Sequence, residues 1–349
     1  MSWLTRTATL SWCHGLSSSK VKPKAHSAVR GYQSVADVKT TKGEVDLDVF
    51  RKYFWLPELP LRFTSFQELP ASKTWFSYEP GTSHVSFSEK LEKHHELILP
   101  YEYIIPDPSS PDLEASAHPD LHAKNLQDFR EWLINTPPDR EDRIPILLQV
   151  LDHFTESRNA GFQQFDAPLD LLMRAHQFNR TRSHPSQRIT RLYIAQSSID
   201  HLPPTLSQDL PVPPLVQGAG KGDIYASSIW VGLEPTYTPL HRDPNPNLFC
   251  QVVGGKTVRL LPPPLGAAVF ARVRQALGSA GHSRFRGPEM MEGPERALLH
   301  RAVWADGADM VQASLGPGDA LFIPKGWWHS VVSAGDEGGL NASVNWWFR

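Results

Sequence analysis

The second half of this sequence is a series of short strand-like segments joined by tight turns, and this pattern constrains the fold most. From Arg188 onward, segments of roughly four to eight apolar or alternating residues are bounded by glycine and proline turns. One helical insert, at 269–277, interrupts the series, and a Gly- and Pro-rich stretch at 278–294 follows it. Short antiparallel strands in this number, with paired turn signals, are typical of a double-sheet jelly roll.

The predicted strands are recognised by alternating polarity or by enrichment in β-branched and aromatic residues. They lie at 188–195, 226–231, 237–241, 248–253, 256–261, 311–315, 320–323 and 342–348. The pair Gly254-Gly255 predicts a tight hairpin between the fourth and fifth of these segments. Another turn is predicted at 316–319, directly before the strand at 320–323.

The first half has more helical character. Apolar spacing predicts helices at 44–54, 126–133, 144–154 and 169–178, the first being the first folded element, and short strands at 61–63 and 74–78. The segment 97–100 is compatible with a helix or a strand, and the proline-rich stretch 106–119 predicts a surface loop. The expected fold class is mostly β with flanking helices (α+β). A mixed α/β region at 44–187 is expected to pack on a jelly roll at 188–349.

Composition narrows the class of protein. Of the 349 residues, 40% are hydrophobic and 21% charged, which is ordinary for a soluble globular protein. The formal net charge of -2 gives no reason to expect binding to nucleic acid or to a membrane surface. No apolar run approaches the roughly 18 residues of a membrane span. The two cysteines, Cys13 and Cys250, do not indicate a disulfide framework, which fits a reducing compartment.

The N-terminal stretch 1–36 contains no acidic residue, while serine is frequent and several residues are basic. It lacks the continuous apolar core of a secretory signal, and this composition is typical of a mitochondrial transit peptide. The sequence Arg30-Gly31-Tyr32 also resembles a matrix-peptidase cleavage site. We therefore expect a disordered mitochondrial targeting segment. The alternative is a polar terminus that happens to lack acids, in a cytoplasmic or nuclear protein.

Two histidines and one aspartate form a candidate metal site. Side chains two positions apart on a strand point to the same face, so His241 and Asp243 are expected to project together. His329 comes 88 positions later (329 minus 241), and the predicted strand at 320–323 is expected to bring it across. Two histidines and a carboxylate leave three positions open, as in non-haem Fe(II) oxygenases. Zinc can use the same ligands. Taken alone, His241 and Asp243 are also compatible with a surface ion pair, and His329 with a core histidine held by a hydrogen bond.

Further polar residues surround this site. Fe(II) with 2-oxoglutarate needs a cation inside the barrel for the distal carboxylate, together with hydroxyl or amide donors. Lys256 opens its strand and can reach inward near Thr238 and Asn247, although a solvated lysine at a strand end is the alternative. Tyr193 and Asn345 are further candidates, each also compatible with a core or sheet-edge position. Four tryptophans are expected to serve packing: Trp327, Trp328, Trp346 and Trp347. Of these, Trp327 or Trp346 is also a candidate for the border of the substrate mouth.

Several separate motifs, in the right order, resemble the JmjC hydroxylase family, which is cupin-like. They cover roughly 191–349 and are Leu192-Tyr193-Ile194-Ala195-Gln196, the stretch from Thr238 to Lys256 with Leu260-Leu261-Pro262-Pro263, Gly318 to His329, and Asn341 to Trp347. The nearest members are the small, stand-alone type without chromatin-reader modules. The resemblance implies a double-stranded β-helix jelly roll. With two cysteines, the zinc-binding segment of some histone demethylases of this family is missing, which argues against histone demethylation.

The resemblance also implies roles for individual residues. His241, Asp243 and His329 would be the iron ligands, and Lys256 and Thr238 would contact the distal carboxylate of 2-oxoglutarate. Tyr193 would be a further hydroxyl contact, and Phe249 would line the cavity. The amides of Asn247 and Asn345 would lie near the metal-proximal carboxylate or its water. The cofactor would be Fe(II), with 2-oxoglutarate and O2 as co-substrates.

The expected function is a dioxygenase that hydroxylates a protein side chain. A histone or protein lysine demethylase and an RNA-base hydroxylase are alternatives within the family. A non-catalytic cupin-like binding module and a zinc or manganese cupin enzyme are alternatives of other classes. The expected partner is a protein or peptide, with RNA as the second choice and no membrane. A homodimer is compatible with the sequence, which does not fix the oligomeric state, and loops at 106–119 and 278–294 are expected to shape the mouth.

Overall fold

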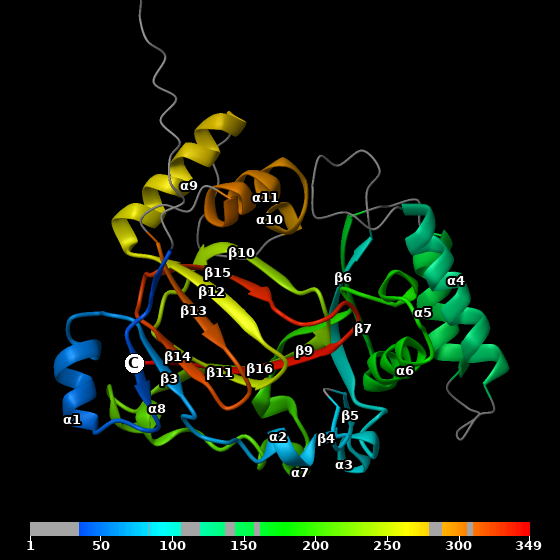
Figure 1. Ribbon diagram of the computed structural model, residues 1–349, viewed down its shortest axis with the longest axis horizontal. Helices are drawn as coiled ribbons and strands as arrows, with labels where there is room; N and C mark the ends of the chain where they lie inside the picture. Colours follow the sequence, from blue (N-terminus) through cyan, green and yellow to red (C-terminus); the bar gives the residue numbers. More distant parts are fainter. Residues whose placement is uncertain are drawn as a thin grey trace, which may run out of the picture. The chain divides into compact units, whose positions relative to one another are not determined.

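Two β-sheets form the centre of the fold (Figure 1). A cavity lies between them. The structure is a computed structural model that describes residues 35–82, 84–105, 119–136, 144–156, 161–278, 288–305 and 310–349. Most of the expected targeting segment 1–36, namely 1–34, lies outside the described residues. The same holds for 106–118 of the loop predicted at 106–119 and for 279–287 of the loop predicted at 278–294.

The smaller sheet has five strands. In spatial order they are β1 (Ala36–Asp37), β13 (Val311–Leu315), β12 (Lys256–Leu261), β15 (Trp328–Ser333) and β10 (Tyr237–Arg242). All neighbours are antiparallel except β1, which pairs parallel with β13. Ala36, which the sequence placed at the end of the targeting segment, is thus part of this sheet and pairs with Val311.

The larger sheet has nine strands. In spatial order they are β2 (Thr40–Lys42), β3 (Leu61–Thr64), β14 (Ala320–Ile323), β11 (Asn247–Val253), β16 (Leu340–Phe348), β9 (Ile224–Leu233), β8 (Tyr193–Ser198), β6 (Ile98–Ile105) and β7 (Gly161–Pro168). A separate hairpin joins β4 (Phe76–Tyr78) to β5 (Val85–Phe87). Because β6 and β7 share a sheet with β8, hydrogen bonds cross the predicted domain boundary at 187/188, and that boundary stays a prediction.

Strands β9 to β16 form the expected jelly roll. Along the chain they alternate between the sheets, with β9, β11, β14 and β16 in the larger and β10, β12, β13 and β15 in the smaller, except that the consecutive strands β12 and β13 pair with each other in the smaller sheet. Such alternation between two sheets is what a double-sheet jelly roll requires. The predicted fold class, a jelly roll with flanking helices, is therefore confirmed.

Two predicted connections are wrong. Gly254-Gly255 does not close a hairpin, since β11 pairs with β14 and β16 whereas β12 pairs with β13 and β15. The turn instead carries the chain from one sheet to the other, with Gly254 at a φ of 70° that favours glycine. The strand at 320–323 likewise belongs to the larger sheet as β14, and His329 lies on β15 of the smaller sheet, a strand that the sequence reading missed.

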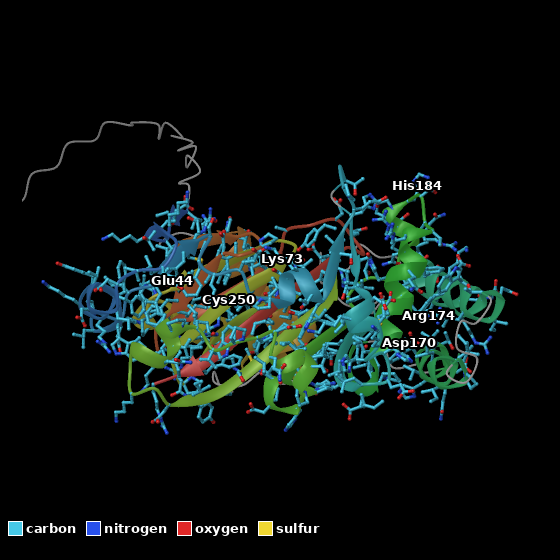
Figure 2. The ribbon with its side chains drawn as sticks, turned by 90° about the horizontal axis from the view of Figure 1, so that it is seen from below. Glu44, Lys73, Asp170, Arg174, His184 and Cys250 are labelled. Atoms are coloured by element: carbon cyan, nitrogen blue, oxygen red, sulfur yellow. The ribbon has the colours of Figure 1, made fainter. Side chains whose placement is uncertain are left out.

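The helices of the first half mostly follow the prediction. They are α1 (Leu47–Phe50) with a π-helical turn at Arg51–Trp55, α2 (Ala71–Thr74), α3 (Glu89–Glu92), α4 (Pro119–Asn135), α5 (Ile144–Glu156) and α6 (Leu169–Arg180). On α6, Asp170 and Arg174 lie one turn apart with 3.5 Å between Oδ1 and Nε (Figure 2). In the segment at 97–100, residues 98–100 belong to strand β6, and Thr74 ends a helix rather than starting a strand. The helix expected at 44–54 is not the first element, because β1 and β2 precede it.

The second half holds more helices than the single insert expected. They are α7 (Pro204–Ser207), α8 (Pro214–Gly218), α9 (Pro263–Leu277), α10 (Pro288–Met291) and α11 (Gly293–His300), with short 3-10 turns at Pro185–Gln187 and Ile199–His201 and a π turn at Arg301–Ala305. Figure 1 shows α9 to α11 beside the smaller sheet, where Phe270 and Val273 of α9 pack in one cluster with Leu240 and Trp328. None of the described helices has the length and apolar character of a membrane span.

Candidate functional site

A cavity of about 390 Å³ lies between the two sheets of the jelly roll. Strands of both sheets line it. The lining residues are Tyr193, Gln196, Tyr225, Ala226, Ser228, Trp230, Thr238, His241, Asp243, Pro244, Asn247, Phe249, Lys256, His329, Val331, Asn345 and Trp347. The set contains all nine residues that the sequence predicted for the site.

Strand alternation explains which side chains reach the cavity. On β16, Asn345 and Trp347 line it, while the intervening Val344 and Trp346 belong to the large hydrophobic core on the other side of the sheet. On β9, which pairs with β16, Ser228 and Trp230 line the cavity while Ile229 faces that core. The barrel strands are thus apolar outward and mixed inward.

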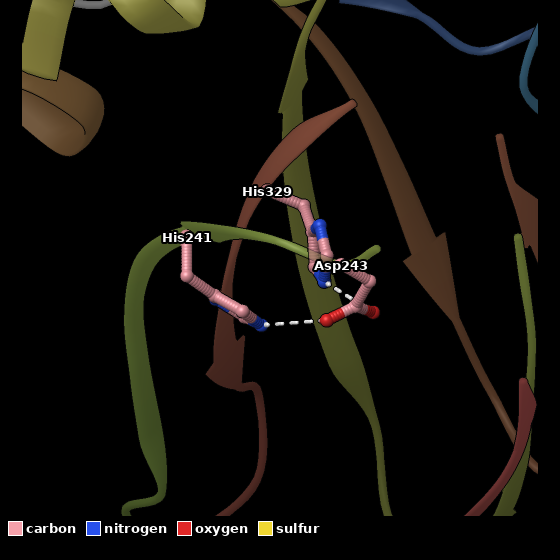
Figure 3. Close-up of side chains that lie close together, drawn as sticks. All are labelled: His241, Asp243 and His329. Carbon is pink, nitrogen blue, oxygen red and sulfur yellow. Dashed lines mark ion pairs between the residues drawn. The ribbon is translucent and has the colours of Figure 1, made fainter. Parts of the chain in front are cut away.

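His241, Asp243 and His329 converge at one end of the cavity (Figure 3). His241 on β10 is the ladder partner of His329 on β15, and Asp243 follows one residue beyond the end of β10. The Nε2 atom of His241 lies 3.8 Å from Oδ1 of Asp243, and that of His329 lies 3.7 Å from Oδ2. One ligand atom from each residue can be chosen so that all three lie within 4.8 Å of one another.

Backbone carbonyls orient both imidazoles. The Nδ1 atom of His241 lies 2.8 Å from the carbonyl oxygen of Pro239, and that of His329 lies 3.2 Å from the carbonyl oxygen of Trp327. Because a carbonyl oxygen only accepts, each Nδ1 must donate, so Nε2, the nitrogen nearer Asp243, is the one on each ring that would bind a metal. Metal-binding histidines have this second hydrogen bond as a rule. The donor set therefore fits a metal ion held by two imidazoles and a carboxylate.

Asp243 is held as a carboxylate. Burial raises the pKa of Asp243, but His329 and His241 and two hydrogen-bond donors outweigh it, so the pKa lies below its ordinary value. The donors are Nε1 of Trp347, at 2.7 Å from Oδ2, and Nδ2 of Asn247, at 3.2 Å from the same oxygen. The two donors hold the carboxylate in position and stabilise its ionised form.

Lys256 lies in the same cavity and is 3% exposed. Its Nζ atom donates to the hydroxyl of Tyr193 at 3.0 Å and to Oγ of Ser343 at 2.9 Å, and the ring of Phe249 lies 5.3 Å away. Burial of an ammonium is costly unless an anion or a set of hydrogen bonds compensates for it. A buried lysine held by two neutral hydroxyls in a cavity fits the carboxylate of a small ligand.

A chain of amides joins this cavity wall to the metal end. Nδ2 of Asn345 donates to Oδ1 of Asn247 at 2.9 Å, and Asn247 donates to Asp243. Oδ1 of Asn345 is buried and has no hydrogen-bond partner among the described residues. A buried acceptor in this state fits a ligand or water that donates to it.

Several residues that position the site were not predicted. Ser343 holds Lys256 and Trp347 holds Asp243, and period-2 alternation from Asn345 would have pointed to both. The tryptophan expectation is corrected, because Trp346 is 1% exposed in the core and Trp327 donates Nε1 to the carbonyl of Glu58. Gln196 has a φ of 52° beside a register shift in β8, which turns it toward the mouth.

Comparisons with known proteins agree with this geometry. A sequence profile described as "Cupin-like domain" matches residues 112–349. The chain is 30% identical over 157 residues to Lysine-specific demethylase 8 of Danio rerio, which is 45% of this chain and 36% of the relative. It is 28% identical over 169 residues to Lysine-specific demethylase JMJ30 of Arabidopsis thaliana, or 48% and 36% of the two chains.

A third relative is Jumonji C domain-containing protein 5 of Drosophila melanogaster, 30% identical over 189 residues, or 54% of this chain and 43% of the relative. The matched part therefore spans less than half the length of each of these three proteins.

Proposed function

Because the chain belongs to the cupin-like domain family and its relatives are JmjC proteins, we propose that it is an Fe(II)- and 2-oxoglutarate-dependent dioxygenase that hydroxylates a protein side chain. The observation that carries the proposal is one cavity with a metal-type triad at one end and a buried lysine in its wall. When bound, the metal and 2-oxoglutarate would supply the oxidising chemistry with O2.

The protein's own residues would bind and orient these groups. His241, Asp243 and His329 would hold the metal through two imidazole nitrogens and one carboxylate oxygen. Lys256 would pair with the far carboxylate of the co-substrate, with the Tyr193 hydroxyl beside it. Thr238 also lines the cavity, where its hydroxyl can add a hydrogen bond.

Apolar residues would keep water from this cavity. Phe249, Trp230 and Val331 line the cavity and are each less than 10% exposed. A dry cavity strengthens the interaction of Lys256 with a carboxylate and protects a reactive oxidant from side reactions. Trp347 contributes to this wall and also donates to Asp243, so one side chain both closes the cavity and orients a ligand.

Charge in the cavity favours hydroxylation of a neutral side chain over demethylation of a lysine. Among the described lining residues, Asp243 is the one acidic side chain and Lys256 the one lysine or arginine. Asp243 would be committed to the metal, so a cationic substrate side chain would find no carboxylate to pair with. Burying such a charge is costly. Neutral groups in the lining, among them Gln196 and Ser228, suit a neutral partner.

The first experiment measures succinate from 2-oxoglutarate with protein loaded with Fe(II) without oxygen and then exposed to O2. Asp243→Ala should reduce turnover to background because the metal loses its carboxylate. The matched control is Asp223→Ala, an exposed carboxylate outside the cavity, which should leave turnover unchanged. Equal turnover in wild type and Asp243→Ala would contradict the proposal.

The same preparation separates the other classes. A zinc or manganese enzyme would bind its metal at the triad without consuming 2-oxoglutarate, and a binding module would need neither. Mass spectrometry of proteins captured by Asp243→Ala and then treated with wild type identifies the chemistry. Gain of one oxygen atom supports hydroxylation, whereas loss of a methyl group with formaldehyde would establish the demethylase named among the relatives.

A further inference from the structure

A buried polar cluster lies where the chain crosses from β11 to β12, just before Lys256. Its members, called here the turn clamp, are Glu234, Gln251 and Asn341, and they are 1%, 2% and 0% exposed. Among them, Glu234 is a carboxylate that holds no part of the metal triad. Burying a carboxylate costs free energy unless hydrogen bonds compensate for the lost hydration, so a buried carboxylate is expected to have a role in the fold or the site.

Glu234 accepts hydrogen bonds through both carboxylate oxygens. Oε1 accepts from Nδ2 of Asn341 at 2.8 Å, and Oε2 accepts from the backbone N–H of Gly335. The backbone of Glu234 is fixed as well, because its N–H donates to the carbonyl of Gly339 at 2.9 Å and its carbonyl accepts from Gly338 at 2.8 Å. The side chain thus has one orientation.

Asn341 and Gln251 pass this restraint to the turn. Nδ2 of Asn341 also donates to the carbonyl of Gly255 at 2.9 Å, and Oδ1 accepts from Nε2 of Gln251 at 3.1 Å. The Gln251 amide donates in turn to the carbonyls of Val253, at 2.7 Å, and Gly254, at 3.3 Å. The clamp therefore holds the three carbonyls directly before Lys256.

The turn has no room for a side chain at Gly254. A Cβ on Gly254 would lie 2.8 Å from Nδ2 of Asn341 and from the carbonyl oxygen of Leu340. Gly254 also has a positive φ of 70°, which side chains rarely adopt. The backbone is thus pressed against the clamp, and the start of β12 is fixed relative to β16.

β16 joins the clamp to the ammonium of Lys256. Asn341 and Ser343 are two positions apart on β16, so both face inward. Asn341 holds the turn before Lys256, and Ser343 accepts from its Nζ atom. Lys256 is therefore fixed at both ends of its side chain by one strand. Burial raises the pKa of Glu234, while Asn341, Gly335, the Lys256 charge and Ser333 act in the opposite direction.

We propose that Glu234 is a positioning residue for Lys256, which acts through the turn clamp to set the affinity for the distal carboxylate of 2-oxoglutarate. This inference rests on the proposed function, because it assigns Lys256 to that carboxylate. Glu234 is neither among the residues that line the cavity nor among the candidate metal ligands. Its effect is expected on 2-oxoglutarate affinity and not on metal binding or on the rate at saturation.

The test is Glu234→Gln, which keeps the shape and replaces one acceptor oxygen by a donor. Facing the donors Asn341 and Gly335, the new amide would break one of the two contacts. The Kd of Mn(II)-loaded protein for 2-oxoglutarate, by calorimetry, and the KM should each rise about tenfold, the effect of losing one charged hydrogen bond. The kcat and the Kd for Mn(II) should stay within about twofold.

The control is Asp209→Asn, the same chemical change at a buried carboxylate in a different cluster. Asp209 accepts from Thr74, Trp75 and Lys90 and does not line the cavity. This variant should lower Tm without changing either Kd. If Glu234→Gln fails to fold, Gln251→Met decides, because it removes the amide that holds Val253 and Gly254 and should raise the Kd for 2-oxoglutarate about threefold.

An unchanged Kd for 2-oxoglutarate in folded Glu234→Gln would overturn the inference and leave the proposed function standing. A parallel loss of Mn(II) affinity and kcat would also overturn it, since that pattern indicates general damage to the barrel. If wild type loaded with Mn(II) binds no 2-oxoglutarate, the proposed function fails and this inference fails with it. The wild-type titration therefore distinguishes the two failures.

Discussion

The metal end and the lysine end of the cavity are built in different ways. At the metal end, His241 and Asp243 are partly accessible, with side chains 13% and 16% exposed, and Asp243 lies just beyond a strand. At the lysine end, Lys256 is 3% exposed and opens a strand in the interior of the smaller sheet. One end is accessible from the mouth, and the other is enclosed by the fold.

The two ends also differ in what holds them. Asp243 is fixed by side chains that touch it directly, Trp347 and Asn247. Lys256 is fixed through hydroxyls and through a turn that three further buried residues hold. Substitutions at the metal end should therefore remove metal affinity and leave the co-substrate contacts intact, while those at the lysine end should do the reverse.

Lys256→Ala should have the largest effect of the substitutions that compare the two ends. A buried carboxylate would lose its charge partner, which costs about 2.7 kcal/mol, or roughly 100-fold in the Kd for 2-oxoglutarate. The Kd for Mn(II) should be unchanged, because Lys256 touches none of the triad in the contacts described for it. Calorimetric titration of each ligand checks both values. Equal losses for metal and co-substrate would show that the two ends are not independent.

Trp347→Phe should give the opposite pattern with a smaller magnitude. Asp243 would lose its 2.7 Å donor, and loss of a partner behind a metal ligand typically costs 10- to 100-fold in metal affinity, so we expect about tenfold for Mn(II). With saturating metal, the Kd for 2-oxoglutarate should change less than about twofold.

Its matched control is Trp346→Phe on the opposite face of the same strand. Trp346 packs in the large core, so this variant should lower Tm and leave both ligand affinities unchanged. A loss of metal affinity in Trp346→Phe as large as in Trp347→Phe would assign the effect to strand stability instead of to the Asp243 contact.

The comparison also explains what the sequence could predict. The triad could be predicted because the i, i+2 spacing of His241 and Asp243 suits one face of a strand, although Asp243 lies just beyond β10, and because the surrounding motifs resemble a known family. The jelly roll could be predicted because each strand has its own local pattern of polar and apolar residues. Lys256 could be proposed since a turn and a strand start locate it, although the partner strands of that turn were assigned wrongly.

Long-range pairing accounts for what was missed. The pair Gly254-Gly255 predicts a turn but does not specify which strands pair on either side of it. The flanking strands β11 and β12 do not pair with each other but with other strands. β7 was not recognised, because an edge strand with polar Gln163 and Gln164 lacks a clear alternation. Ser343 and Glu234 gained their roles from contacts 87 and 107 positions away along the chain, which no local pattern contains.

Among the substitutions that compare the two ends, Ser343→Ala should have the smallest effect, and it tests how far a single hydroxyl positions Lys256. The ammonium of Lys256 would keep the Tyr193 hydroxyl but lose the acceptor at 2.9 Å, so it would be less well fixed toward the carboxylate. Because the Tyr193 hydroxyl and the turn still hold Lys256, the loss in 2-oxoglutarate binding should be about 1 kcal/mol, which raises the Kd about fivefold, with Mn(II) binding unchanged. Ser72→Ala removes a buried hydroxyl that donates to the Leu69 carbonyl far from the cavity lining, and it should change neither affinity. An unchanged or tighter Kd in Ser343→Ala would show that the turn alone positions Lys256, because the hydroxyl would then contribute nothing that the backbone does not already fix.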